Sequence, residues 1–335
     1  PNLQVTKIRE WHQKIDEARY SSPESGFHPA SFESLEEERQ IWIMGNLSQL
    51  LPLSPISLRL TNLLRNPQFS PKEVAGIAQK DPVLSARLLR AANSAYFGLR
   101  YEVTSIGRAV VLLGYNQIRT LLLEDVLRKN LPSQNPEERE RANKIWLHSM
   151  VVSVCAGELG HRVSGGKEVD WGTLGLLHDI GKCFFFLLEQ KRGRLKGEPS
   201  LFQEEKHYGI NHAVLGDMMA RNWKLPEEIV TPIGLHHHPT FFDPDHLPST
   251  HRLTTSLIHL ADHLSKVLGF TGDSQEIYPL RVPYLKHLRI GTDLKTLVTP
   301  SLIHEIEKVV LINEAAGPLE AARKEERKDG STGVG

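Results

Sequence analysis

Seven histidine and aspartate residues, spread from position 148 to position 262, fall in segments whose apolar residues recur at helical spacing. His148, for example, shares an apolar stripe with Ile145 and Val152. An imidazole or carboxylate inside a helical bundle is unfavourable unless another group pairs with it. Because five segments each carry such a residue, we expect a shared partner, most simply one or two divalent metal ions. The seven candidate metal ligands are His148, His178, Asp179, His212, His236, His237 and Asp262.

One adjacent pair among them, His178-Asp179, sharpens the prediction. Neighbouring residues on a helix point about 100° apart, so the pair can reach one metal, or one metal and its neighbour, from a single turn. Imidazole and carboxylate without thiolate suit Fe, Mn, Ni, Co or Zn and do not choose among them. Lys182 follows His178 by four residues. It is placed on the same helix face, where it would hold an anionic phosphate near the metal.

Residues that typically start or end helices are frequent along the chain, and the alternating apolar pattern of strands is rare. This predicts an all-α fold of two helical lobes. In Ser70-Pro71-Lys72-Glu73 the serine is expected to cap a helix, with proline at its first position and glutamate completing a capping box. Gly98 and Gly114 are expected to end helices. Further predicted helix starts are Asp81-Pro82, Asp170, Leu225-Pro226 and Thr299-Pro300.

The same helix starts and ends, with the linker-like segments between them, divide the chain into four predicted regions. Residues 1–40 form an N-terminal helix and a linker, and residues 41–131 form the first helical lobe. Residues 136–317 form the second lobe, which carries the metal ligands, and residues 318–335 form a charged, glycine-rich, disordered tail.

Several motifs together resemble two related families. The order of the seven residues, with the run His178-Asp179-Ile180-Gly181-Lys182, resembles the HD superfamily of metal-dependent phosphohydrolases, especially the HD-GYP branch that hydrolyses cyclic dinucleotides. Asp81-Pro82-Val83-Leu84, Asn93-Ser94-Ala95-Tyr96-Phe97-Gly98, and Ala109 followed by Leu113-Gly114 look like the HDOD signature. The HDOD family joins a helical lobe to an HD-like lobe and occurs in bacterial signalling. The resemblance covers roughly residues 45–270.

The resemblance implies roles for the residues. Asp179 would bridge two metals, and Lys182 would bind a substrate phosphate. His148, His178 and Asp262 would complete one metal site, and His212, His236 and His237 would supply the second. Asp179 and Lys182 are therefore the candidate catalytic residues.

The departures from both families also carry information. Most HDOD proteins have lost many of the metal ligands and are regarded as non-catalytic, whereas this chain retains them. HD-GYP proteins have a glutamate after the paired histidines and then a Gly-Tyr-Pro signature, and residues 236–242 contain neither. The glutamate that helps hold a third metal in some HD-GYP enzymes corresponds to Lys144. A trinuclear centre is therefore not expected, and cyclic-di-GMP is not assumed as the substrate.

Each candidate also has a purely structural interpretation. His148 would then be a core histidine, and residues 236–238 would form a solvated helix end, where histidine favours the helix dipole. Asp262 would be exposed, with His259 or His263 as alternative ligands close by. Lys182 would be an ordinary solvated lysine.

Composition indicates the cellular compartment and argues against some classes of partner. The 40 basic and 40 acidic residues cancel, which argues against broad attraction to nucleic-acid polymers or membranes. Cys155 and Cys183 both fall on apolar helix faces, as expected of buried free thiols in a reducing compartment. No apolar run approaches about 20 residues, and residues 1–4 lack a signal-sequence pattern. We therefore expect a cytoplasmic protein.

Two functions remain open. In the first, the chain is a metal-dependent phosphohydrolase acting on a nucleotide or cyclic dinucleotide. In the second, it is a non-catalytic signalling adaptor that binds protein partners and keeps a structural or vestigial metal site. A donor set larger than the roughly four ligands of a structural metal favours the first function. The HDOD-like lobe and the missing Gly-Tyr-Pro segment favour the second.

Overall fold

The computed structural model describes residues 3–24, 26–47, 70–80, 82–130, 136–163, 169–185, 189, 199–223, 225–272 and 276–316. Within these ranges the regular secondary structure is helical and no β-strand occurs, which confirms the predicted all-α class. The predicted tail, residues 318–335, and the predicted lobe boundary, residues 131–135, lie outside the described residues. In the part of the chain that is described, no helix combines the length and apolar character that crossing a membrane requires.

The chain divides into two compact units. Unit 1 comprises Pro1–Leu51, Asn130–Pro132 and Lys144–Ile306, and unit 2 comprises Pro52–Lys129, Ser133–Asn143 and Glu307–Gly335. Two long helices, α7 (Pro136–Val163) and α16 (Pro300–Ala316), contribute residues to both units. These limits differ from the sequence-based regions, because the N-terminal residues belong to the same unit as the candidate metal ligands.

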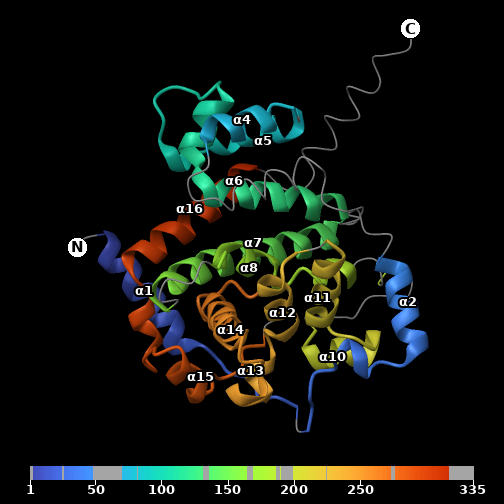
Figure 1. Ribbon diagram of the computed structural model, residues 1–335. Helices are drawn as coiled ribbons and strands as arrows, with labels where there is room; N and C mark the ends of the chain where they lie inside the picture. Colours follow the sequence, from blue (N-terminus) through green and yellow to red (C-terminus); the bar gives the residue numbers. More distant parts are fainter. Residues whose placement is uncertain are drawn as a thin grey trace. The chain divides into compact units, whose positions relative to one another are not determined.

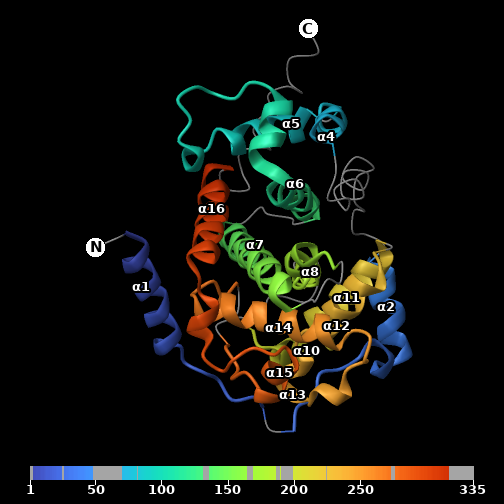
Figure 2. The ribbon, with the colours of Figure 1, turned by 60° about the vertical axis from the view of Figure 1, so that its left-hand side comes forward.

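Unit 1 contains the candidate site and most of the helices. They are α1 (Leu3–Glu17), η1 (Phe32–Ser34), α2 (Glu37–Leu47), α8 (Trp171–Leu177), α10 (Leu201–Tyr208), α11 (His212–Asn222), α12 (Glu227–Leu235), α13 (His238–Phe241), η3 (Pro244–His246), α14 (Arg252–Val267), α15 (Val282–His287) and η4 (Leu294–Leu297), with most of α7. Figures 1 and 2 show α14 among α7, α8 and α12. All residues from Thr254 to Ser265 of α14 are buried, as expected of a helix surrounded by others.

Two glycines allow the helices around α14 to approach closely. A Cβ atom added at Gly175 of α8 would lie 2.7 Å from the carbonyl oxygen of Val152 in α7. A Cβ atom added at Gly181 would lie 1.9 Å from the carbonyl oxygen of His212 and 2.6 Å from the nitrogen of Gly216. These contacts draw the end of α8 and the turn after it against both α7 and α11.

Residues 18–24 and 26–36, here called the N-terminal strap, overlap the predicted linker at residues 21–26 and pack against other parts of unit 1. Its Ser21 amide donates to the carbonyl of Ile277 at 2.8 Å. Phe27 makes edge contacts with Phe202 and Phe241, with ring centroids 5.4 and 5.3 Å away. The strap therefore has specific partners, although its sequence of Ser, Pro and Gly reads as a linker.

Unit 2 contains α4 (Pro71–Ala78), α5 (Pro82–Ala92), η2 (Ala95–Phe97) and α6 (Ile106–Asn130). Apolar residues of α4, α5 and α6, among them Val74, Leu88, Val110 and Ile118, form one core together with Ile312 of α16.

Of two local predictions in unit 2, one needs correction and one is confirmed. Ser70 is the N-cap residue of α4, but its side chain makes no capping hydrogen bond. Proline at the first helical position starts this helix without that bond. Gly114 does end a helical segment: its φ of 70° and ψ of 178° are non-helical and divide α6 into two helical segments. Glycine tolerates this positive φ without a Cβ clash, so the first segment can end there and the chain can enter the second.

Candidate metal centre

All seven predicted ligands lie in two neighbouring groups. The first group is Asp179, His212, His236 and His237, and the second is His148, His178 and Asp262. Within each group the candidate donor atoms lie within 4.8 Å of one another. These groups are the two sets that the sequence assigned to two sites. Six of the seven residues are buried, and His237 is partly exposed.

The sequence predicted that the candidate ligands lie within helices, but most of them lie at helix ends. His148 and Asp262 do lie inside α7 and α14. His212 is the first residue of α11, His178 is the C-cap of α8, and Asp179 lies in the following turn. His236 is the C-cap of α12 and His237 is the N-cap of α13. At a helix end the chain changes direction, which lets adjacent side chains reach the same centre.

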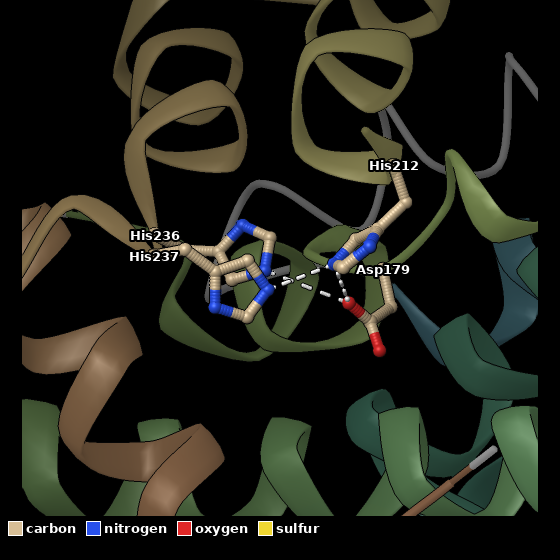
Figure 3. A group of neighbouring side chains, drawn as sticks. All are labelled: Asp179, His212, His236 and His237. Atoms are coloured by element: carbon tan, nitrogen blue, oxygen red, sulfur yellow. Dashed lines mark hydrogen bonds and ion pairs between the residues drawn. The ribbon is translucent and has the colours of Figure 1, made fainter. Parts of the chain in front are cut away.

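The first group converges on one carboxylate oxygen (Figure 3). Asp179 Oδ1 lies 3.1 Å from His212 Nε2 and 3.5 Å from His236 Nε2. His237 Nε2 lies 2.8 Å from His212 Nε2, so three imidazole rings from three helix ends face the same small volume.

The second group is joined to the first through Asp179. His148 Nε2 lies 3.1 Å from Asp262 Oδ1 and 3.2 Å from His178 Nε2. Asp179 Oδ1 lies 3.5 Å from His178 Nε2, and its Oδ2 lies 3.6 Å from His148 Nε2. Asp179 thus contacts both groups, which is the position that a bridging carboxylate requires.

Four of the histidines are oriented by hydrogen bonds from their outward-facing nitrogens. The Nδ1 atoms of His148, His178 and His236 donate to the carbonyls of Phe270, Gly175 and Ile233 at 2.7, 2.8 and 2.6 Å. His212 Nδ1 donates to Glu204 Oε2 at 2.6 Å. Because these oxygens only accept, each Nδ1 carries the proton. In the neutral ring, Nε2 then presents a lone pair to the centre.

This donor arrangement fits a bound divalent metal. Inward lone pairs at Nε2–Nε2 distances of 2.8 and 3.2 Å repel one another unless a proton or a metal lies between them. His236 Nε2 is buried and forms no hydrogen bond within the described residues. Histidines that donate their second ring nitrogen to a carbonyl or carboxylate are typical of metal sites. Imidazole with carboxylate suits the transition metals and does not identify one.

Each carboxylate of the centre is also paired with a lysine. Lys182 Nζ lies 2.8 Å from Asp179 Oδ2, and Lys266 Nζ lies 2.8 Å from Asp262 Oδ2. Lys182 is 3% exposed. Lys182 is therefore not the solvated lysine of the structural interpretation, because its ammonium group contacts the central carboxylate. The i,i+3 spacing after the turn directs it inward and not toward solvent.

The buried charges set the protonation of the metal-free centre. Burial would raise the pKa of Asp179, but His178, Lys182 and His212 hold that pKa well below its ordinary value. Burial would lower the pKa of His212, but Glu204 and Asp179 raise it to about 9. Burial lowers the pKa of His236 to about 4 and that of His237 well below its ordinary value. His212 is therefore protonated at neutral pH, whereas His236 and His237 are neutral.

The alternative ligands of α14 have other contacts. His259 bonds through Nδ1 to the carbonyl of His236 at 2.9 Å, and the ring of His263 stacks on Tyr20. Asp262, which the sequence left open as an exposed residue, is 3% exposed and lies in the centre. Lys144 is exposed.

The sequence did not single out two residues that contact the centre, Glu204 and Lys266. Lys266 follows Asp262 by four residues, and that spacing on a helix is a signal for an ion pair. Glu204 lies one residue after the capping box of α10, Ser200 with Gln203, and has no comparable signal. Its partner His212 is eight residues away, beyond the left-handed Gly209 that ends α10.

A family comparison agrees with the geometry. The HDOD domain family matches residues 50–239, which is more than half of the chain. The chain belongs to the HDOD family. A curated relative, an uncharacterized protein of Treponema pallidum (strain Nichols), is 24% identical over 188 residues. The match covers 54% of this chain and 36% of the relative, so the chain spans about a third of that relative's length.

Solved structures share the HDOD fold at low identity. An HDOD domain protein of unknown function from Geobacter sulfurreducens is 23% identical, with 85% of this chain and 99% of that chain covered and a TM-score of 0.55. A protein named as a candidate metal-dependent phosphohydrolase, from Shewanella amazonensis SB2B, is 18% identical, with 84% and 100% covered and a TM-score of 0.51. A protein named as a candidate signal transduction protein, from Marinobacter aquaeolei VT8, is 18% identical, with 94% and 67% covered and a TM-score of 0.61.

Proposed function

We propose that this HDOD protein is a bacterial signalling protein whose unit 1 is a metal-dependent phosphohydrolase acting on a nucleotide or cyclic dinucleotide. The observation that carries the proposal is the set of seven donors, in which four histidines are held by their Nδ1 atoms and present Nε2 to a common centre. A structural metal needs only about four ligands. The name of the Shewanella amazonensis protein, a candidate metal-dependent phosphohydrolase of the same fold, agrees with this reading.

The residues of the centre would have different roles in holding two metal ions. Asp179, in contact with both groups, would bridge two ions; His212, His236 and His237 would complete one site, and His148, His178 and Asp262 the other. A divalent metal supplies Lewis-acid polarisation of phosphoryl oxygens and makes water a stronger nucleophile near neutral pH. Lys182 holds the Asp179 carboxylate in place through Oδ2. Substrate would approach beside His237, the one ligand of the seven that is not fully buried.

The test is metal analysis followed by an activity screen. Protein purified without chelator should carry transition metal. With added Mn²⁺ or Fe²⁺ it should hydrolyse a member of a panel of cyclic dinucleotides, linear dinucleotides and mononucleotides. Asp179→Ala should lose both metal and activity. Asp217→Ala is the matched control, because Asp217 pairs with Arg221 in α11 and is not among the candidate ligands. Less than about a tenth of an equivalent of metal after reconstitution would refute the metal site.

One observation favours the adaptor as a second candidate function. The carboxylates of Asp179 and Asp262 are each paired with a lysine, so the centre is partly charge-compensated before any metal binds. Buried charges are retained in proteins when they are paired in this way. The adaptor would use the centre as a structural ion-pair network and would bind protein partners elsewhere. Metal-loaded protein that turns over no member of the panel would favour this function over the enzyme.

A further inference from the structure

The four oriented histidines do not have equivalent hydrogen-bond acceptors. Three donate to neutral backbone carbonyls, whereas His212 donates to the carboxylate of Glu204. We infer that Glu204 is a positioning residue that makes the first group, Asp179 with His212, His236 and His237, the tighter of the two metal sites. The inference rests on the proposed metal centre and adds an order of binding to it.

Glu204 fixes His212 through two hydrogen bonds to one oxygen. Its Oε2 accepts from His212 Nδ1 at 2.6 Å and from the backbone amide of His212 at 2.9 Å. Glu204 is 2% exposed, so both bonds are shielded from water. The ring of His212 is thereby held relative to its own backbone, with Nε2 directed toward Asp179 Oδ1 at 3.1 Å.

A carboxylate acceptor acts on metal affinity in a way that a carbonyl does not. It draws the Nδ1 proton toward itself and raises the basicity of the ring as a ligand. It also places a fixed negative charge one imidazole away from the bound cation, in a buried environment where such a charge is poorly screened. Both effects strengthen metal binding at the deprotonated Nε2 of His212.

The second group has no such charge behind its histidines. His148 Nδ1 faces the carbonyl of Phe270 and the hydroxyl of Ser265, and His178 Nδ1 faces the carbonyl of Gly175. The lysines do not distinguish the groups, because Asp179 and Asp262 each have one at 2.8 Å. Among the described contacts of the histidine Nδ1 atoms, the charge that separates the two groups is therefore that of Glu204.

The neighbouring glutamate provides a matched control. Glu205 Oε1 accepts from the Ala30 amide at 2.8 Å and from Asn211 Nδ2 at 2.6 Å. It belongs to the same helix and is also held by hydrogen bonds, but its described bonds join the N-terminal strap and the N-cap of α11 and not a candidate ligand.

The experiment is a Co²⁺ titration of the metal-free full chain, followed by calorimetry and by visible absorption. Wild type should bind in two steps. Glu204→Gln, which keeps the shape and removes the charge, should weaken the tighter step about 10- to 100-fold and change its Co²⁺ spectrum. Glu205→Gln should bind as wild type does. Glu204→Asp, which keeps the charge and changes the length, should retain more affinity than Glu204→Gln.

The same substitution made in a His148→Ala variant shows which of the two sites is affected. In His148→Ala the second group is incomplete, so the tight step should remain and Glu204→Gln should still weaken it. A tight step that is unchanged in Glu204→Gln, or a loss confined to the weaker step, would overturn the inference and leave the metal centre standing. Equal loss in Glu204→Gln and Glu205→Gln would assign Glu204 a structural role only. Wild type that binds no Co²⁺ would overturn both the inference and the proposed function.

Discussion

The α-carbon of Gly181 lies against the carbonyl oxygen of His212, so that a methyl group at position 181 would be 1.9 Å from that oxygen. The second-nearest atom to such a methyl group is the nitrogen of Gly216, at 2.6 Å. Both are backbone atoms, which cannot rotate away as a side chain can. This contact fixes the distance between the turn that carries Asp179 and the start of α11, which carries His212.

We predict that Gly181→Ala separates Asp179 from His212. The added methyl group must move α11, at a cost of about 1–3 kcal/mol of folding free energy, as is usual for overpacking. Metal content should fall with it. Gly157→Ala in α7 is the control, since a Cβ atom there meets nothing within 4 Å. It should stabilise the helix by about 0.5–1 kcal/mol. Urea denaturation with metal analysis measures both, and unchanged metal content in Gly181→Ala would contradict this account.

Lys182→Met tests the pairing of the central carboxylate. Without metal, removing the ammonium group leaves Asp179 as a buried charge with less compensation, which should destabilise the fold by about 3–5 kcal/mol. With metal, the loss of a positive charge 2.8 Å from Asp179 should strengthen metal binding. The difference between the melting temperature with excess Mn²⁺ and that with EDTA should therefore be larger in the variant than in wild type. A phosphate-binding lysine without a role in the ion pair would leave the EDTA melt unchanged.

The pKa of His212 predicts proton release on metal binding. Burial lowers this pKa, but Glu204 and Asp179 raise it to about 9 in the metal-free protein. At pH 7 His212 holds a proton that a metal at Nε2 must displace, whereas His236, with its pKa lowered to about 4, is already neutral.

These two pKa values determine how metal affinity changes with pH. About one proton should leave per metal at pH 7, affinity should rise about tenfold per pH unit, and both effects should fade above pH 9. Because the pKa of His212 is raised on folding, its contribution to metal-free stability is complete below its ordinary pKa of 6.5 and is lost as pH rises through 9. Calorimetry in two buffers with different ionisation enthalpies counts the protons. Release of no proton at pH 7 would show that His212 is neutral.

The helical class and the candidate ligands were predicted from the sequence for separate physical reasons. Caps and glycines act locally, so Asp170 and Pro300 could be assigned to the starts of α8 and α16 from their neighbours alone. His148 and Asp262 stood out because a polar residue on an apolar stripe needs a partner. The orienting residue Glu204 could not be found in this way. A glutamate in an amphipathic helix ordinarily faces solvent, and its partner His212 is reached only after the chain reverses at Gly209.

The N-terminal strap shows the same limit, since the composition of residues 21–26 indicates a linker, while the adjacent Phe27 is held between Phe202 and Phe241. We predict that Phe27→Ala releases it. The side chain is partly buried, so the loss should be roughly 1–3 kcal/mol, below the 3–5 kcal/mol typical of a fully buried phenylalanine. Limited proteolysis should then cut within residues 21–31 faster than in wild type. Tyr101→Ala, at a side chain that is 73% exposed in unit 2, is the control and should change neither stability nor cleavage. Equal cleavage of wild type and Phe27→Ala would show that these aromatic contacts do not hold the strap. The strap would then behave as the linker that its composition suggests.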